Sequence, residues 1–240
     1  MATGAGIEPT EFREPGQDYR GVTLWMLNDE LNESEMERQL RGFAEAGWGA
    51  VITRTFNGLR TPYLSDDWHR MVHRTIEIAG ELGMKVWLQA GYMPAGVPEL
   101  PADEELQVIE RTPIESESGS GDHNLGGGAA DGAGGGSLLY RDDDHEYRAV
   151  GLPNVLDLLN PEACARYVHA AYTGPMAAEY AADLGHTVET VWVDEPHFIP
   201  PAMPWSRTFA DDFSARWGYD IRNELPSLFT ESGDYRRVRH

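Results

Sequence analysis

Lysine is almost absent from this chain: lysine and arginine together number 19, and Lys85 is the only lysine. Acidic residues number 40, so the formal net charge is -21. Such a surface repels the phosphates of nucleic acids and the headgroups of anionic membranes, which excludes both as partners. An acidic, lysine-poor surface is typical of proteins that stay soluble in concentrated salt, where repulsion between carboxylates is screened. We therefore interpret the protein as halophilic, with the acidic bias of a GC-rich genome as the alternative.

Cysteine is equally scarce. Cys164 is the only one, which excludes internal disulfides and a thiolate metal cluster, and its helical surroundings predict a small core residue. The N-terminal 21 residues contain no basic region, apolar run or twin arginine of a secretion signal. No stretch approaches 18 uninterrupted apolar residues, so no transmembrane helix is predicted. These absences predict a soluble, cytoplasmic protein.

Several site motifs are also missing. No G-x-G-x-x-G follows the first strand pattern, no G-x-x-x-x-G-K-[ST] occurs, and no G-x-S-x-G offers a serine nucleophile. HRMVH at 69–73 has the histidine spacing of zinc proteases, but Arg70 stands where the base should be, so we predict surface or boundary histidines and no zinc. No cofactor is expected. A cation stays an alternative at the acidic run 141–147, which we interpret first as a solvated charge run, and calcium stays an alternative at the single imperfect glycine repeat GGGAADGAGGG.

Four units, each a strand followed or preceded by a helix, are present along the chain. Apolar, β-rich runs predict strands at 20–29, 49–55, 85–90 and 187–195. Amphipathic patterns predict helices after Asn32 and Ser65, which are suited to capping, and over 161–185, with Asn160 as its cap and a break at Gly174. A further helix ends at Gly218.

Nearly continuous hydrophobic strands that alternate with helices predict a parallel sheet, as a doubly wound sheet or a (β/α)8 barrel. Each predicted strand ends in polar residues, which favours a barrel because barrels place their chemistry at the carboxyl ends of strands. Only the first four β/α units of such a barrel are present. We expect an N-terminal extension over 1–19 and one partial barrel domain over 20–240, with a flexible Gly/Ser/Asp-rich loop at 115–137.

The fourth strand, in VETVWVDEPHF, ends on two adjacent carboxylates, Asp194 and Glu195. A carboxylic acid that is partly shielded at a strand end can act as a general acid. Adjacent strand residues point to opposite sides, so only one of the two faces the site, and parity alone does not choose between them. A strand-terminal turn without chemistry is the alternative.

The chain resembles the barrel domain of glycoside hydrolases of family 106, the α-L-rhamnosidase-type enzymes, over about residues 20–98 and 150–240. The resemblance lies in the order and spacing of WMLNDELNESEMERQL, NGLRTPYLSDDWHRMVHRTIEIAGELGMKVWL, VLDLLNPEACARYV, VWVDEPHF and FSARWGYDIRNELPSLF. It implies a glycosidase that acts on a carbohydrate substrate, with Glu195 as general acid and Asp194 beside it. The expected substrate-binding residues are Trp25, Asn28, Arg54, Gln89, Tyr92 and His197.

Two departures from the family matter. Gln89 and Ala90 stand where similar proteins tend to carry carboxylates, and four β/α units are half of a barrel. We therefore expect a fragment that needs a C-terminal half-barrel chain or a homodimer to close. A non-catalytic sugar-binding remnant and a metal-dependent lyase that uses Asp194 and Glu195 as ligands stay as alternative functions.

Overall fold

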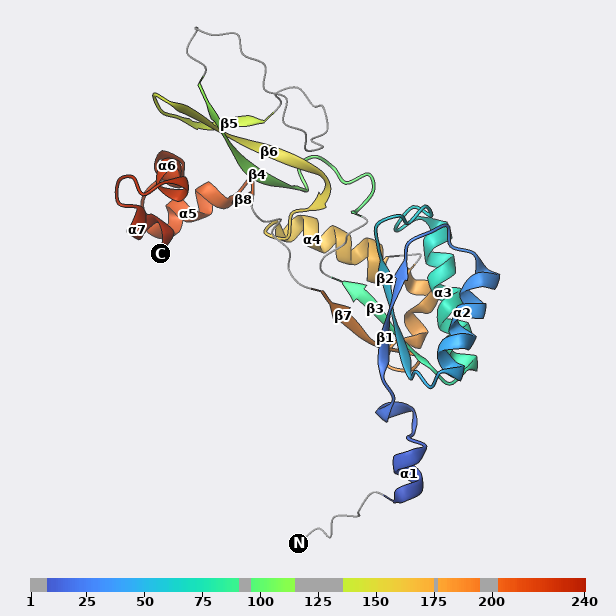
Figure 1. Ribbon diagram of the computed structural model, residues 1–240. Helices are drawn as coiled ribbons and strands as arrows, with labels where there is room; N and C mark the ends of the chain where they lie inside the picture. Colours follow the sequence, from blue (N-terminus) through green and yellow to red (C-terminus); the bar gives the residue numbers. More distant parts are fainter. Residues whose placement is uncertain (1–7, 91–95, 115–135, 175–176, 195–202) are drawn as a thin grey trace, which may run out of the picture. The chain divides into compact units, whose positions relative to one another are not determined.

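The structure is a computed structural model that describes residues 8–90, 96–114, 136–174, 177–194 and 203–240 (Figure 1). The chain divides into two compact units: unit 1 is Met1–Pro98 with Ala165–His197, and unit 2 is Glu99–Cys164 with Phe198–His240. The sequence predicted a single partial barrel domain over 20–240. In the structure, residues 99–164 form strands that share a core with residues between 205 and 238, and the two segments together make unit 2.

Unit 1 is built around a parallel sheet. Two short helices, α1 (Pro9–Arg13) and η1 (Gln17–Tyr19), precede it. The elements that follow are β1 (Val22–Leu27), α2 (Glu33–Glu45), β2 (Ala50–Thr55), α3 (Asp66–Glu81), β3 (Lys85–Ala90) and β7 (Val188–Val193). The four strands lie in the order β1-β2-β3-β7 and all pairs are parallel, as the sequence predicted.

A closed barrel is not present in the part of the chain that the structure describes. There the parallel sheet has four strands, and β1 and β7 are its two outer strands. The coarser prediction of a parallel α/β sheet is confirmed, whereas the barrel itself is not shown.

The two faces of this sheet differ. Trp25 lies on the face toward α2, where its ring is 5.9 Å from Phe43 and its indole N–H donates to Gln39 at 2.7 Å. Residues of β1, β2 and β3 that point to the same face as Trp25 are buried beneath α2 and α3, which lie on one side of the sheet in Figure 1. They are Leu27, Val51, Thr53, Thr55, Val86 and Leu88. The residues of the candidate functional site described below lie on the opposite face.

The predicted helix caps are confirmed. The side chain of Asn32 accepts from the backbone N–H of Glu35 at 3.2 Å, and Ser65 accepts from Trp68 at 3.2 Å. Each cap satisfies a backbone donor that the first turn leaves without a partner. One face of α3 is buried, with Val72 fully inaccessible, and it includes Trp68, Met71, Ile76 and Ala79.

The helical stretch predicted for 161–185 is present in three pieces: α4 (Pro161–Val168), the π-helical turn η2 (His169–Thr173) and the 3-10 helix η3 (Ala177–Asp183). Asn160 caps α4, since its side chain accepts from the backbone N–H groups of Glu162 and Ala163 at 3.0 and 3.2 Å. The predicted break at Gly174 coincides with the end of η2. Burial raises the pKa of the Cys164 thiol, so this cysteine stays protonated at neutral pH.

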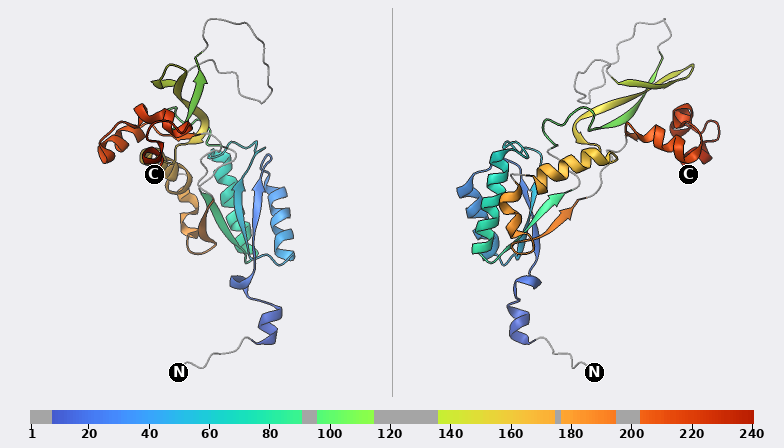
Figure 2. Two further views of the ribbon diagram at one scale, coloured as in Figure 1. Left: turned by 60° about the vertical axis from the view of Figure 1, so that its left-hand side comes forward. Right: turned by 180° about the vertical axis from the view of Figure 1, so that it is seen from behind.

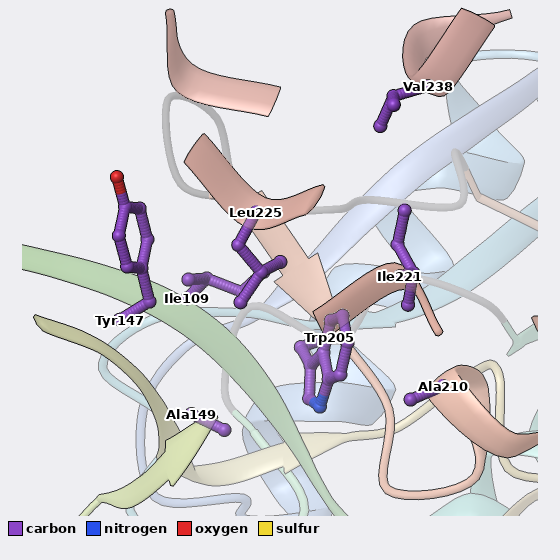
Figure 3. Close-up of a cluster of buried hydrophobic side chains, with 8 residues drawn as sticks. All are labelled: Ile109, Tyr147, Ala149, Trp205, Ala210, Ile221, Leu225 and Val238. Carbon is purple, nitrogen blue, oxygen red and sulfur yellow. The ribbon is translucent and has the colours of Figure 1, made fainter. Parts of the chain in front are cut away.

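Unit 2 is an antiparallel sheet with helices. Its strands are β4 (Glu105–Pro113), β5 (Ser137–Arg141), β6 (His145–Leu156) and β8 (Met203–Trp205), in the order β5-β6-β4-β8. Its helices are α5 (Phe209–Trp217), η4 (Ile221–Glu224), α6 (Leu225–Phe229) and α7 (Tyr235–Arg239). Gly218, at φ +77°, ends α5 as predicted. Figure 3 shows the core formed by Ile109, Tyr147, Ala149, Trp205, Ala210, Ile221, Leu225 and Val238.

The sequence analysis missed this sheet. Of the predicted flexible loop at 115–137, residues 115–135 lie outside the described residues, while Ser137 already begins β5. The acidic run 141–147 covers the end of β5, the turn at 142–144 and the start of β6. There Asp142 accepts backbone hydrogen bonds from Asp144 and His145, which lower the pKa of its carboxyl.

Among the residues that the structure describes, no helix combines the length and the apolar character that a membrane span requires. These residues have a second negative feature. They also contain no group of three or more His, Cys, Asp or Glu side chains arranged to hold a metal ion.

Candidate functional site

The carboxyl ends of the four parallel strands meet at one edge of the unit 1 sheet, and an ion pair lies there. Arg54, near the end of β2, donates from Nη2 to Oδ2 of Asp194, which directly follows β7, over 2.5 Å. Both side chains are largely buried, at 15% and 9% exposed. The backbone N–H of Asp194 also donates to the carbonyl of Ala90 at 2.9 Å, so it continues the pairing of β7 with β3.

The strand register places this pair on the face opposite α2 and α3. Met26 pairs with Arg54, and Gln89 pairs with Trp192, whereas the helix-facing Trp25 pairs with Thr53. Asp194 shares the parity of Trp192. The question that parity left open in the sequence is therefore answered for Asp194: its side chain lies on the face that would be the interior of a barrel.

Two aromatic rings surround the guanidinium of Arg54. Its central carbon lies 5.4 Å from the centre of the Phe56 ring and 5.7 Å from that of Trp192. Cation–π attraction at these distances adds to the ion pair and holds the planar group in one orientation. The Nε atom of Arg54 is buried and has no acceptor among the described residues. A hydrogen-bond donor is therefore left over at the site.

The other predicted site residues are distributed unevenly. Gln89 lies at this edge, buried at 6% exposed, on the same face as Arg54. Asn28 directly follows β1 and is exposed, and its carbonyl would lie 2.9 Å from a Cβ atom at Gly58, where φ is +98°. Glycine is thus required for the β2–α3 loop to approach the end of β1. Trp25 is not at the edge: it is buried under α2, which does not fit the predicted role of a sugar-stacking ring.

Three predicted site residues, Glu195, Tyr92 and His197, lie outside the described residues. The structure therefore brings together Arg54, Asp194 and Gln89 from the predicted set. Phe56 and Trp192 join them, and the sequence analysis had not named either as a site residue. The signal that could have identified them is their position: each lies within two residues of a predicted strand-end charge.

Two buried tyrosines and one half-buried tyrosine lie under this edge, on the helix side of the sheet. The hydroxyls of Tyr63 and Tyr167 are 2.8 Å apart, those of Tyr167 and Tyr172 are 3.4 Å apart, and Tyr172 donates to the backbone carbonyl of Gln89. Burial raises the pKa of all three hydroxyls, so they remain protonated donors. The set ties α4 and η2 to the carboxyl end of β3.

His69 belongs to the same layer. It was predicted to lie at the surface or the boundary, but it is buried at 2% exposed, and its Nδ1 lies 3.1 Å from the hydroxyl of Tyr180. Burial lowers the pKa of His69, against a backbone hydrogen bond with Ala170 and the charges of Asp66 and Glu179. The prediction failed because η3, which supplies Tyr180, covers a helix face that looks half polar in the sequence.

A small cavity beside the tyrosines does not suit a sugar. It is lined in part by Thr53, Trp68 and Tyr180, and its volume of about 10 Å³ is room for one water molecule. The arrangement that can act on a ligand is the carboxyl edge of the sheet. There a neutralised guanidinium offers hydrogen bonds, two rings offer contact area, and the chain continues from Asp194 directly into Glu195.

Comparisons with known proteins give little. No protein-family model matches this sequence, and no curated protein matches it. Among solved structures, a rhamnosidase from Novosphingobium sp. PP1Y is similar at a TM-score of 0.32 and 17% sequence identity, over 44% of this chain and 11% of that chain. The chain thus spans about a tenth of the length of that rhamnosidase.

Proposed function

We propose that unit 1 is the catalytic half-barrel of a glycoside hydrolase that cleaves the glycosidic bond of a rhamnose-type sugar at the carboxyl edge of its sheet. The observation that carries this proposal is the Arg54–Asp194 ion pair, which lies at that edge on the face opposite the helices. Enzymes with parallel β/α sheets bind their substrates at the carboxyl ends of the strands. The choice of sugar rests on the sequence resemblance alone.

In this proposal the two adjacent carboxylates have different tasks. Asp194 is engaged with Arg54, so it holds the guanidinium in place, and the remaining N–H groups of Arg54 donate to sugar hydroxyls. Glu195 lies two residues past the end of β7, so strand alternation does not fix the direction of its side chain, and it serves as the general acid that protonates the glycosidic oxygen. Gln89 contributes hydrogen bonds and no proton transfer, since its amide does not ionise.

The test is hydrolysis of a panel of aryl glycosides, with aryl α-L-rhamnoside first. Glu195→Gln should lower the rate by about 100-fold or more, because glutamine cannot donate the proton that the leaving oxygen needs. The matched control is Glu189→Gln, which removes a carboxylate from the amino end of the same strand, where Glu189 accepts a hydrogen bond from Trp87 at 3.0 Å. Equal rates in the two variants, or no hydrolysis by the parent protein, would contradict the proposal.

A sugar-binding protein without catalysis is the second candidate. Gln89 favours it, because a neutral amide occupies the strand end where a second acid could have stood. Calorimetric titration with the sugar separates the two: binding with no turnover by intact protein supports this candidate. Loss of turnover on addition of EDTA would instead support a metal-dependent lyase, in which Asp194 and Glu195 bind a divalent cation.

A further inference from the structure

A second group of charged side chains lies at the amino end of the unit 1 sheet. A cavity of about 70 Å³ is lined there by the starts of β1, β2 and β3, by β7 and by the segment before β1. One buried water molecule needs about 10 to 15 Å³, so this amino-end cavity has room for a small ligand. Lys85 pairs with Ala50 and Trp87 with Ile52, on the face of the sheet that carries Arg54. The cavity is therefore on the same face as the carboxyl-edge site, toward the opposite end of the strands.

The segment before β1 forms one wall of the amino-end cavity, and it is fixed on the sheet. The side-chain amide of Gln17 donates to the carbonyl of Gly49, and the backbone N–H of Gly49 donates to the carbonyl of Gly21 at 2.9 Å. A Cβ atom at Gly49 would lie 2.7 Å from the Cβ of Arg20, so this close approach requires glycine. In both views of Figure 2 the segment lies at the end of the sheet where β1 begins. The wall is thus part of the fold of unit 1.

The two cations of the cavity can form further hydrogen bonds. Lys85, the only lysine of the chain, donates to the carbonyl of His186 at 2.8 Å, and its ammonium has two further N–H groups. Arg20 donates from Nε to the carbonyl of Pro15 at 3.1 Å, and the N–H groups of its two amino nitrogens are further donors. Both side chains line the cavity. They offer it charged donors, one from β3 and one from the wall.

A ring and two carboxylates complete the polar lining. The indole N–H of Trp87 donates to Oε2 of Glu189 at 3.0 Å, and this bond holds the ring in one orientation. Asp18 is exposed and presents its carboxylate to the cavity. Two positive and two negative side chains thus line the cavity, and their formal charges cancel. An anion would be repelled by the carboxylates and a cation by Lys85 and Arg20, which favours a neutral ligand.

We propose that the amino-end cavity binds one ring of a neutral sugar, at a site distinct from the carboxyl edge. Sugar hydroxyls both donate and accept, so they match a lining that offers charged donors and a carboxylate acceptor. They accept from Lys85 and Arg20 and donate to Asp18. The apolar face of the sugar ring packs on the indole of Trp87, whereas Glu189 accepts from that indole and does not bind the sugar. No proton transfer takes place here, so the inference does not depend on the catalytic step of the proposed function.

Two tryptophans report separately on the two sites. Trp87 lines the amino-end cavity, and the ring of Trp192 lies 5.7 Å from the guanidinium carbon of Arg54 at the carboxyl edge. The test is titration of the isotope-labelled full chain with L-rhamnose, D-galactose and D-glucose, read from the indole N–H resonances, which Trp87→Phe and Trp192→Phe identify. We expect at least one sugar to shift the Trp87 resonance along a saturable curve. Inorganic phosphate and choline, an anion and a cation, should leave that resonance unchanged.

Arg20→Met should raise the dissociation constant for that sugar at least about tenfold, because a charge-assisted hydrogen bond is lost. Arg20 is exposed, so the variant should fold, and circular dichroism checks this. Arg13→Met is the matched control: Arg13 is also an exposed arginine before β1, but it does not line the cavity, and its change should leave the dissociation constant as it is. Lys85→Met is a second variant with the same expected loss.

The inference is overturned if none of the three sugars shifts the Trp87 resonance, or if phosphate or choline shifts it instead. Equal dissociation constants for Arg20→Met and Arg13→Met overturn it as well. A sugar that shifts the Trp87 resonance of a protein without glycosidase activity supports this inference and contradicts the proposed function. Hydrolysis of an aryl glycoside by a protein whose Trp87 resonance no sugar shifts does the reverse.

Discussion

The ion pair between Arg54 and Asp194 gives the most direct test of the candidate site. At 4 Å and an effective dielectric constant of 20, two unit charges attract by about 4 kcal/mol. Desolvation offsets part of this attraction, but removal of one partner leaves the other charge buried, which typically costs about 3 kcal/mol or more. We expect Arg54→Met and Asp194→Asn each to lower the free energy of unfolding of unit 1 by about 3 kcal/mol, and the double variant by much less than the sum.

The assay is a double-mutant cycle, read by denaturant unfolding and by hydrogen exchange of the β2 and β7 amides, which report on unit 1 alone. Arg60 and Asp29 provide the control pair, since their atoms are also 2.5 Å apart but the side chains are 67% and 72% exposed. An exposed pair should couple by less than about 1 kcal/mol. Equal coupling energies in the two cycles would refute the argument that burial gives the Arg54–Asp194 pair its strength.

Two further predictions concern pH and salt. Burial lowers the pKa of His69 below the value of about 6.5 that histidine has in an unfolded chain. Between these two pKa values the unfolded chain binds a proton that the folded protein does not, so the free energy of unfolding should fall as pH drops below about 6.5. His69→Phe should flatten this dependence, and an unchanged slope of unfolding free energy against pH would contradict it. Added KCl should raise the melting temperature, because salt screens the repulsion in a chain that has 40 acidic and 19 basic residues. A melting temperature that is independent of salt would count against the halophilic interpretation.

Much of unit 1 could be predicted from the sequence because its signals are local. The four strands are apolar runs that end in polar residues, and the caps at Asn32, Ser65 and Asn160 are short-range hydrogen bonds. Each of these patterns depends on fewer than about ten neighbouring residues. The order of the strands followed from the β/α alternation.

Unit 2 could not be predicted in the same way. β4 and β6 pair residues such as Gln107 and Gly151, which lie far apart in the chain, and β4 contains Glu110 and Arg111 among its apolar residues. Alternation is weak in such strands, and their stability comes from cross-strand pairs that the sequence does not reveal. The same reason explains the error at His69, whose burial depends on Tyr180, 111 residues away.

The ion pair also explains why an apolar strand ends in a charge. Arg54 belongs to β2 and Asp194 follows β7, so the pair reaches over β3, the strand between them. Two strand spacings are about 10 Å, a distance that a long arginine side chain covers most easily if the sheet curves toward the face opposite the helices. The Arg54 side chain crosses β3 on this face, and this accounts for the burial of Gln89. That residue is 6% exposed although α2 and α3 do not cover its face of the sheet. A charged strand end and a buried glutamine thus have one physical cause, the ion pair that crosses β3 on this face.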